Sequence, residues 1–330
     1  IAKFATNGVT AISLTEGEVN THVTNGVLAN GSITVGTVTA TSQTNVLNNI
    51  AKFAANGITA ITFADENAVS TNNSQISTNA FAASSITVSA SAVTDTSKTT
   101  VVANIAKFVD NQISAITLNG TQYATVASST AKLQNDALTL AIEAAETRDF
   151  SSDSNLAAKL TSASVASGGD LTISSAQAVG INITGVGNLT VANVGASDDL
   201  SGIASSLTAT GTIADGINIS GNTNIGNFDN FTLNTDASAT LSIAQNAKVT
   251  GGGGTNTITL SAAGTTTGGT GIETYNLAAG TNVFNSANGG QTVVGNTGAD
   301  TITGGTGNDQ LSGNGGDDVL SGGLGNDTIT

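Results

Sequence analysis

The sequence predicts a mainly β protein in which small α/β helix–strand repeat modules precede a parallel β-solenoid that occupies the C-terminal half. Three observations support this fold class: a segment that recurs three times near the N-terminus, short stretches that alternate apolar and polar residues, and a final stretch with a nine-residue period. Together they divide the chain into five segments: residues 1–49, 50–104 and 105–160 for the three modules, 165–294 for the solenoid and 295–330 for the nine-residue units.

The three modules share an apolar segment that recurs at spacings of 49 and 55 residues, over 1–14, 50–63 and 105–118. Each module is predicted to contain a helix, a turn, a strand, a polar stretch and a second strand, such as residues 33–35 or 86–88. The first copy lacks the start of its helix, so we expect the sequence to begin inside a module of a longer protein. Helix–strand repeats of this kind resemble modules of very large bacterial surface and adhesin proteins.

The helix of the third module is predicted from apolar residues at steps of one, three and four, namely Val101, Val102, Ile105, Phe108 and Val109. Asp95 and the polar residues after it can cap free N–H groups, so we expect the helix to begin there. In the second module, Asn56-Gly57 is expected to end the helix, because glycine tolerates the left-handed conformation of a helix cap. Ile58, Ile61 and Phe63 then open a strand.

A further helix is predicted over residues 131–147, from the positions of Leu133, Ala137, Leu138, Ala141 and Ile142. This helix would carry Glu143 and Glu146 on its surface. We expect these two carboxylates to be surface charges rather than an acid–base pair, and the same holds for Glu16 and Glu18.

From residue 165 to residue 294 the sequence changes to short segments in which apolar residues alternate with Thr, Ser or Asn: 171–174, 181–184, 189–191, 217–220, 231–234, 241–243 and 257–260. Alternation with period two predicts strands with one buried and one exposed face. Gly or Asn separates the strands, and the lack of strict two-residue hairpin signals favours a β-solenoid. A β-sandwich is the alternative.

The last 36 residues are four nine-residue units, 295–303, 304–312, 313–321 and 322–330, each with a glycine-rich turn, Asp at position six and an apolar residue at position eight. The apolar residues are expected to point inward and to stack: Ile302, Leu311, Leu320 and Ile329. Glycine allows positive φ and exposes carbonyl groups, and each turn adds one carboxylate. Ca²⁺ binds such mixtures of carboxylate and carbonyl oxygens. The units therefore predict a calcium-binding array.

These units resemble the nonapeptide G-G-x-G-x-D-x-U-x of RTX calcium-binding β-rolls. The resemblance implies that two units form one coil, that ions lie in turns between coils, and that Asp300 lies beside the 313–318 turn and Asp309 beside the 322–327 turn. The ligands carried over are the carboxylates of Asp300, Asp309, Asp318 and Asp327 and carbonyls near Gly298, Thr306, Gly307, Gly315, Gly316, Leu324 and Gly325. The first unit departs from the motif at Asn296 and Ala299, which implies a capping or weaker site.

Composition narrows the function further. The net charge of −15 argues against nucleic acid and anionic membranes as partners, and the absence of Cys excludes disulfides. Apolar residues make up 38% of the chain and are regularly spaced, so the chain is expected to fold. No run of about 18 apolar residues predicts a transmembrane helix, and no N-terminal signal peptide is visible. RTX proteins typically use a one-step (type I) export route that reads a C-terminal signal, which agrees with this absence.

A second resemblance involves residues 271–280, which read G-I-E-T-Y-N-L-A-A-G and are similar to a motif of RTX-bearing surface-layer proteins of Gram-negative bacteria. It implies a secreted, non-enzymatic protein of the bacterial cell surface that uses Ca²⁺ to fold and assembles with copies of itself into a surface layer, sheath or filament. Cell-surface polysaccharide is a further expected partner. The alternatives are a spacer and calcium-roll segment of a large RTX adhesin, and the non-catalytic part of a secreted RTX enzyme.

The remaining candidates for chemistry are weaker. His22 is the only histidine and is expected to be a loop residue, and the zinc-protease motif H-E-x-x-H is absent. Residues 251–254 are four glycines without the Lys of a phosphate loop, and Asn256-Thr-Ile-Thr mirrors Asp300-Thr-Ile-Thr. We therefore interpret this stretch as a wide turn or a degenerate nonapeptide. Additional Ca²⁺ could bind at four carboxylates expected in turns: Asp198, Asp199, Asp215 and Asp229.

Overall fold

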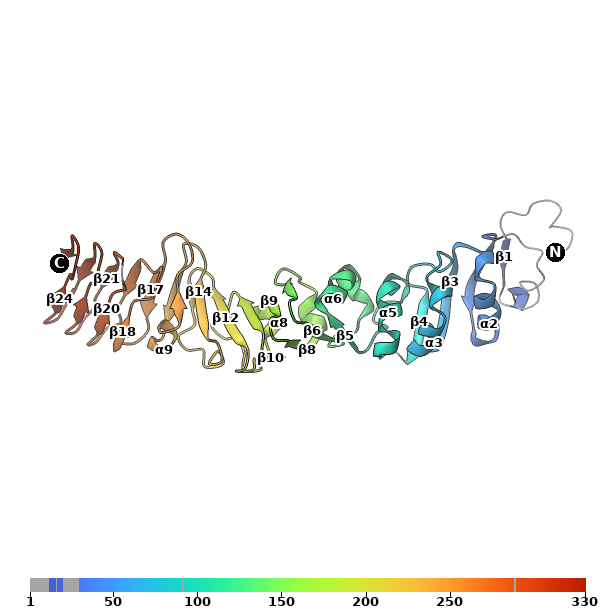
Figure 1. Ribbon diagram of the computed structural model, residues 1–330, viewed down its shortest axis with the longest axis horizontal. Coiled ribbons are helices and arrows are strands. Elements are labelled where there is room, and N and C mark those ends of the chain that lie inside the picture. The colour runs from blue at the N-terminus through green and yellow to red at the C-terminus, as the bar shows by residue number, and fades with distance from the viewer. Residues whose placement is uncertain (1–11, 16, 20–29, 91, 288) are drawn as a thin grey trace. The chain divides into compact units, whose positions relative to one another are not determined.

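The structure is a computed structural model that describes residues 12–15, 17–19, 30–90, 92–287 and 289–330. The chain forms two compact units, one of residues up to 141 together with 155–162, the other of residues 142–154 together with 163–330. Short strands dominate both units and are joined by turns and short helices (Figure 1). Glu16 and His22 lie outside the described residues, as does most of the first copy of the recurring segment.

The strands of the first unit are β1 (Ile12–Leu14), β2 (Ile33–Val38), β3 (Phe53–Asp65), β4 (Ile86–Ala90), β5 (Ile116–Asn119) and β6 (Leu138–Ile142), which ends at the first residue of the second unit. Its helices are α2 (Ala40–Asn48), α3 (Glu66–Thr71), α4 (Asn73–Ile76), α5 (Asp95–Ala103), α6 (Gly120–Val126) and α7 (Leu156–Lys159), with 3-10 turns η3 (Ile50–Lys52), η4 (Ile105–Lys107) and η5 (Ala127–Lys132). Strands β1 to β4 form a parallel sheet in sequence order, and β5 pairs in parallel with β6.

The core of the first unit is made by apolar residues that stack from strand to strand. Ile61 of β3 pairs with Ile86 of β4, and Phe63 pairs with Val88. All four side chains are at most 5% exposed. The predicted strands over residues 33–35 and 86–88 are thus confirmed, because their alternate side chains fill this core.

Two helix predictions in the modules need correction. Asn56-Gly57 does not end a helix but lies inside β3, where the register with β2 shifts. Asn56 takes a positive φ of 56°, and a Cβ on Gly57 would lie 2.6 Å from the Ile33 carbonyl oxygen, so the pair forms a bulge. Helix α5 begins at Asp95 as predicted, with a capping box before it, but it ends at Ala103, and Phe108 is extended.

The helix predicted over residues 131–147 is wrong. The chain leaves η5 at Lys132, and β6 begins at Leu138. Leu138, Leu140 and Ile142 of β6 are at most 2% exposed, whereas the residues between them are half-buried. The helical spacing of apolar residues is therefore overridden by pairing with β5, which buries every second side chain.

The second unit contains most of the strands. They are β7 (Thr147–Asp149), β9 (Asp170–Ser174), β10 (Asn182–Gly185), β11 (Asn188–Ala192), β12 (Thr208–Ile213), β13 (Ile217–Asn218), β14 (Asn230–Leu233), β15 (Ser238–Leu241), β16 (Val249–Thr250), β17 (Thr257–Leu260), β18 (Thr265–Thr267), β19 (Thr274–Asn276), β20 (Val283–Asn285), β21 (Thr292–Val294), β22 (Thr301–Thr303), β23 (Gln310–Ser312), β24 (Val319–Ser321) and β25 (Thr328–Ile329). Strand β8 (Leu160–Val165) spans the boundary between the units, and the short helices are α8 (Ser175–Ala178) and α9 (Ile243–Asn246).

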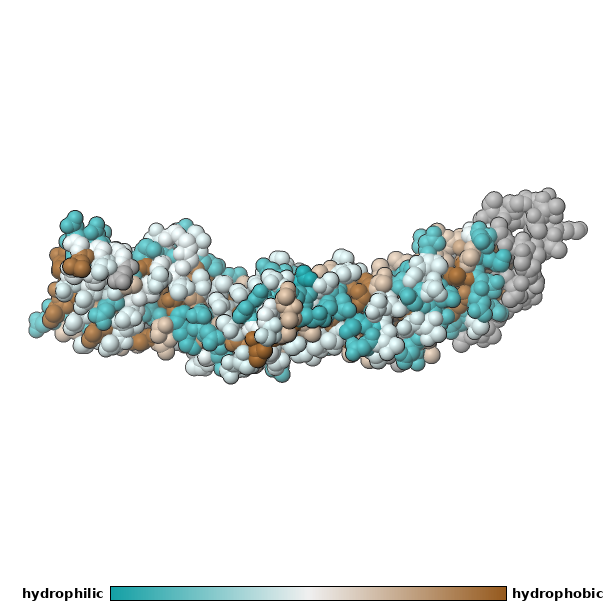
Figure 2. Space-filling model, in the orientation of Figure 1, coloured by the Kyte–Doolittle hydropathy of each residue, from teal (hydrophilic) through white to brown (hydrophobic). Residues whose placement is uncertain are grey.

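Three parallel sheets organise the second unit, in the orders β16-β14-β12-β11-β9-β7, β13-β15-β17-β19-β21-β23-β25 and β18-β20-β22-β24. Neighbours in a sheet are separated in sequence by one coil, so Leu171 pairs with Leu189, and Thr274 pairs with Thr292. This arrangement confirms the parallel β-solenoid and its C-terminal β-roll, and it excludes the β-sandwich for these strands. On the face drawn in Figure 2, apolar residues are scattered among pale and hydrophilic ones, as expected for strands with one polar face.

Asparagine and glutamine side chains hold the corners of the solenoid. Ser174 and Gln177 form a capping box at α8, and Gln177 also donates from Nε2 to the carbonyl oxygens of Phe150 (2.8 Å) and Asp153 (2.6 Å) in the preceding coil. Gln177 is only 2% exposed. Buried carbonyl groups of one coil thus receive hydrogen bonds from amides of the next, as burial of polar groups requires.

Candidate metal-binding turns

The four nine-residue units form two stacked columns of turns. Thr301 of β22 pairs with Val319 of β24, and Gln310 of β23 pairs with Thr328 of β25, each over 18 residues. The turns before these strands therefore stack alternately, 295–300 on 313–318 and 304–309 on 322–327. Asp300 and Asp309 lie beside the turns that the RTX resemblance predicted.

Glycine at position four gives the turns their shape. Gly298, Gly307, Gly316 and Gly325 all have positive φ, between 117° and 140°. The N–H groups of Gly298 and Gly307 donate to carbonyl oxygens of the next coil, at 2.7 and 2.8 Å. A β-carbon on Gly316 or Gly325 would overlap the backbone of the previous coil. Other residues would strain this conformation, so the motif needs glycine here.

Glycine at position one leaves room for the carboxylate of the same turn. A Cβ on Gly295 would lie 2.7 Å from Asp300 Oδ2, and one on Gly304 would lie 2.8 Å from Asp309 Oδ2. The same added atom on Gly304 would also overlap the carbonyl oxygen of Gly322 in the next coil. Asp309 Oδ2 and the Gly322 carbonyl therefore both lie close to Gly304, at the boundary between two stacked turns.

The carboxylates also connect successive coils through hydrogen bonds. The Asp300 N–H donates to Asp318 Oδ1 at 2.8 Å, and the Asp309 N–H donates to Asp327 Oδ1 at 3.0 Å. Asp300 and Asp309 are each 1% exposed, whereas Asp318 and Asp327 of the last coil are half-buried. Oδ1 of Asp318 and of Asp327 is thus used for the fold, and Oδ2 of Asp300 accepts the Asn296 N–H at 3.3 Å.

Asp309 carries a buried carboxylate oxygen that could bind a cation. Its Oδ2 atom is buried and has no hydrogen-bond partner among the residues that the structure describes. Burial raises the pKa of Asp309, and the charge of Asp327 raises it further, against the hydrogen bond from the Gln291 N–H. The sequence after Lys248 contains neither Lys nor Arg. A divalent cation would satisfy this oxygen and offset the charge, so the donor set fits calcium.

Five of the seven predicted carbonyl ligands fall into two groups. The carbonyl oxygens of Thr306, Gly315 and Leu324 accept the N–H groups of the position-four glycines of the neighbouring coil, at 2.7 to 2.8 Å. Those of Gly298 and Gly307 lie against the turns of the next coil, beside Gly316 and Gly325. All predicted ligands therefore lie within the two columns, and their coordination of an ion stays a prediction. The described residues contain no group of three or more His, Cys, Asp or Glu that could hold a metal by themselves, so carbonyl groups would have to complete the site.

Two residues of the columns, Asn282 and Gln291, were not predicted from the sequence. The N–H groups of Asn282 and Gln291 donate to Asp300 Oδ1 (2.9 Å) and Asp309 Oδ1 (2.8 Å), and both side chains are buried. They occupy position six of two degenerate nine-residue units. In each unit, the glycine at position four and the apolar residue at position eight could have revealed the nine-residue pattern: Gly280 with Phe284, and Gly289 with Val293.

Asn256 also connects neighbouring coils through hydrogen bonds, as its similarity to Asp300 in the sequence suggested. Its Oδ1 atom accepts the Ala237 N–H at 3.3 Å, and its own N–H donates to Glu273 Oε2 at 2.6 Å. A Cβ on Gly251 or Gly252 would overlap backbone carbonyls of neighbouring coils. The four glycines are therefore a tightly packed solenoid turn within a degenerate unit.

The other carboxylates considered from the sequence accept hydrogen bonds, either within one turn (Asp198, Asp199) or from a neighbouring coil (Asp215, Asp229). Asp198 accepts the Gly195 N–H at 2.7 Å, Asp199 accepts from Ser201, Asp215 from Ser238, and Asp229 from the Ala209 N–H at 2.9 Å. The hydrogen bonds from the two serines lower the pKa of Asp199 and Asp215. Additional calcium at these positions stays a prediction.

Glu143 and Glu146 lie in a turn and not on a helix. Glu146 accepts the Glu143 N–H at 3.1 Å and pairs with Arg148 at 3.0 Å.

None of the helices in the described part of the chain has the length and apolar character needed to span a membrane.

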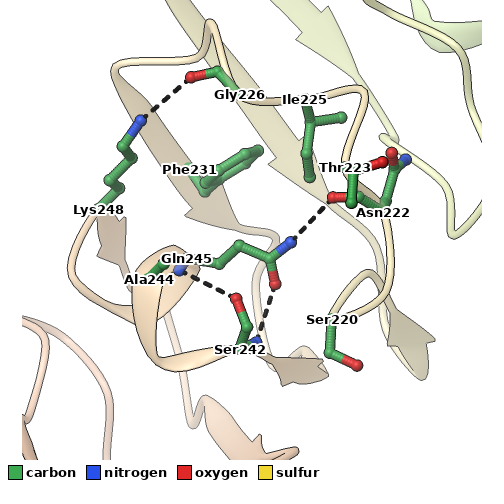
Figure 3. Close-up of a pocket in the computed structure, with 10 residues that line it drawn as sticks. All are labelled: Ser220, Asn222, Thr223, Ile225, Gly226, Phe231, Ser242, Ala244, Gln245 and Lys248. Carbon is green, nitrogen blue, oxygen red and sulfur yellow. Dashed lines mark hydrogen bonds between the residues drawn. The ribbon is translucent and has the colours of Figure 1, made fainter.

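The second unit also contains a cavity of about 310 Å³ near α9 (Figure 3). Phe231 and Ile225 provide its apolar side, and polar groups close it by contacting one another. Gln245 donates to the Asn222 carbonyl at 3.5 Å and caps α9 with Ser242. Lys248 donates from Nζ to the carbonyl oxygens of Gly226 (3.4 Å) and Phe228 (2.6 Å). These polar groups hold coils together, which is a structural role.

Comparison with known proteins identifies the C-terminal units. The family model of the RTX calcium-binding nonapeptide repeat matches residues 294–329, in four copies. Searches of curated proteins and of solved structures return no match for the chain. RTX nonapeptide repeats bind calcium, and the matched residues contain the two columns of turns described above.

Proposed function

From the premise that residues 294–329 are RTX calcium-binding repeats, we propose that this chain is part of a secreted, non-enzymatic structural protein that self-assembles on the bacterial cell surface. RTX repeat proteins are typically secreted, which fits an extracellular location. The observation that carries the proposal is the stack of parallel coils that ends in acidic turns, with the buried and unpartnered Oδ2 atom of Asp309 among the described residues.

Calcium acts as the folding switch in this proposal. Without it, five Asp side chains crowd the turns between residues 295 and 327 and no basic residue lies nearby in sequence, so the roll is unfavourable and the chain stays open for export. Outside the cell, calcium at about millimolar concentration saturates extracellular sites. Binding free energy then becomes folding free energy, because the unfolded chain lacks the site.

Repetition of the surface supports assembly. Coils that stack in register carry polar residues in lines across the sheet, such as Thr257, Thr274 and Thr292. A surface that repeats from coil to coil can form the same contact many times with another copy or with a surface polysaccharide. The segment over residues 271–280, similar to surface-layer proteins, lies in and around β19 of the same sheet.

The test is electron microscopy of the purified chain with about 5 mM Ca²⁺ and with excess chelator, accompanied by circular dichroism. Sheets or filaments that form only with calcium, together with a gain of β signal, are expected. Folded monomers with calcium would instead favour a spacer of a large adhesin. A β signal that ignores the chelator would contradict calcium-driven folding of the roll.

A matched pair of variants makes this test specific. Asp318→Asn changes position six of the third unit, and Asp317→Asn removes the same charge from the exposed neighbour at position five. Only Asp318→Asn is expected to weaken calcium-dependent assembly. Equal effects of both variants would mean that net charge, rather than the site, controls assembly.

A further inference from the structure

The two turns that precede the RTX repeats share the position-four glycine conformation and the inter-coil hydrogen bond of the RTX turns. They end at Asn282 and Gln291, and their position-four glycines, Gly280 and Gly289, have φ of 110° and 109°. The N–H group of each glycine donates to a carbonyl of the next coil at 2.7 Å, as in the repeats. Strands β20 and β21 pair with β22 and β23 in the same 18-residue register. The structural frame of the roll therefore extends one coil upstream.

Position six differs in this upstream coil. Asn282 is 1% exposed, and its Nδ2 atom donates to the carbonyl oxygens of Ala278 and Gly280, each at 2.9 Å. The same atom lies 2.9 Å from Asp300 Oδ1. An uncharged NH₂ group thus binds the carbonyl groups of the turn and one oxygen of the next carboxylate.

Gln291 plays the equivalent part in the other column. It is 5% exposed, and its Nε2 atom donates to the Ile272 carbonyl at 2.6 Å, with the Gly269 carbonyl at 3.5 Å. Its Oε1 atom accepts the Ala287 N–H at 2.8 Å. The longer side chain reaches back to the preceding coil, and its hydrogen bonds are made without any ion.

We propose that Asn282 and Gln291 close their turns to calcium and thereby set the position in the chain where calcium dependence begins. The Asn282 NH₂ group donates to carbonyl oxygens of its own turn, which would otherwise face a cation. The Gln291 side chain accepts the Ala287 N–H of its own turn and donates to carbonyl oxygens of the preceding coil. Neither side chain brings a negative charge to attract a cation. The coil that contains β20 and β21 is therefore folded without calcium. It presents a preformed sheet edge on which β22 and β23 pair when calcium binds, so the ordered template avoids part of the nucleation cost of the roll.

This inference rests on the calcium-driven folding in the proposed function and is independent of self-assembly. A chain that binds no calcium would contradict both. A variant that binds calcium with an unchanged number of ions would contradict the inference alone.

The direct test is Asn282→Asp in the full chain, with calcium stoichiometry measured by titration calorimetry. The substitution replaces NH₂ with O⁻ and places a second carboxylate beside Asp300, so we expect one more bound ion than in the wild type. Asn222→Asp is the matched control, because Asn222 is also a buried amide, 9% exposed, that donates to carbonyls of the preceding coil. It lies outside the RTX frame and should add no ion. A folded Asn282→Asp variant with the wild-type ion count overturns the proposal.

Hydrogen–deuterium exchange of the wild type in excess chelator gives a second test that needs no variant. Amides of β20 and β21 should stay protected, whereas those of β22 to β25 should exchange at least about tenfold faster than with calcium. In Asn282→Asp, β20 should join the calcium-dependent group. If β20 and β21 of the wild type lose protection together with β22 to β25, the template does not exist and the proposal is wrong.

Discussion

The coils held by lysine and the coils of the RTX repeats meet the same physical requirement in different ways. Parallel coils bring main-chain carbonyl groups together in their turns, and buried carbonyls need donors or cations. In the first unit, Lys107 donates from Nζ to the carbonyls of Ile76 and Thr78, and Lys159 donates to that of Leu133 at 2.8 Å. In the RTX coils, residues 295–330 contain no Lys or Arg, and carboxylates face the carbonyls instead.

Under the proposed function, this difference confines calcium dependence to the coils of the RTX repeats. Lys159 and Lys248 each lie directly before a strand, and Lys107 lies directly before the β-bridge residue Phe108, so these donors are part of the chain itself. A bound Ca²⁺ is exchangeable and depends on the surroundings. Side-chain amides such as those of Gln177 and Asn282 are a third kind of partner for the buried carbonyl groups, and they carry no charge.

The largest expected effect comes from removing both carboxylates of one column. Asp309→Asn/Asp327→Asn should abolish the calcium-induced gain of β signal in that column, because each Asn supplies an NH₂ donor and no charge. Calcium titration followed by circular dichroism measures it, with Asp317→Asn as the control at an exposed carboxylate of the same region. A normal calcium response of the double variant would show that carbonyl groups alone hold the ion.

The next effect concerns the backbone of the calcium turns. Gly307→Ala should lower the free energy of unfolding of the calcium-bound protein by roughly 3 kcal/mol, from strain and crowding together. Gly307 has φ of 117°, and its Cβ would lie 2.5 Å from the Gly290 nitrogen. Gly221→Ala is the control, since Gly221 has open space around the added carbon. Urea unfolding compares the two, and equal stabilities would refute the crowded geometry.

A lysine variant tests the coils of the first unit, in which Lys donates to the buried carbonyl groups. Lys107→Met should cost about 1–3 kcal/mol, because buried carbonyls lose their donor. The loss should be the same with calcium and with chelator, because Lys107 lies in the first unit. Lys98→Met, which breaks a pair with the 94% exposed side chain of Asp95, should cost less than about 1 kcal/mol. Urea unfolding of the first unit is the measurement, and a calcium-dependent loss in Lys107→Met would contradict the comparison.

The smallest effect is a pH dependence at Asp215, which lies outside the RTX repeats. Hydrogen bonds from the Ser238 hydroxyl and N–H lower the pKa of Asp215 below its ordinary value of 3.8. A carboxyl with a lowered folded pKa stabilises the protein above its ordinary pKa, and this contribution disappears as pH falls through the folded value. Ser238→Ala removes the largest cause. Its stability should therefore fall less than that of the wild type between pH 7 and pH 3.

The control for this pH experiment is Thr240→Ala on the same strand, β15. Its urea midpoint should follow the wild-type pH dependence. Parallel curves for Ser238→Ala and the wild type would mean that the hydroxyl does not act on Asp215.

The nine-residue periodicity, together with the RTX resemblance that it revealed, predicted the roll and its columns. Glycine and aspartate recur at fixed positions because the turn needs positive φ and oxygen ligands, and these requirements are local. The RTX resemblance supplied the two-unit coil that places Asp300 beside the 313–318 turn, and this placement is confirmed by the hydrogen bond to Asp318. Alternating strands such as Leu171–Ile173 were predictable for the same reason, since one face must be buried.

Contacts between coils determined the features that the sequence did not reveal. Leu138, Leu140 and Ile142 also fit a helical spacing, and pairing with β5 made them a strand. Asn56-Gly57 has the composition of a helix end, yet it forms a bulge because β3 must match β2. Asn and Gln occur at many positions of this sequence, and the role of Asn282 and Gln291 depends on the backbone carbonyl groups that the fold places beside them. Local sequence specifies a conformation when the residue itself requires it, whereas partners one coil away decide between conformations that the residue allows equally.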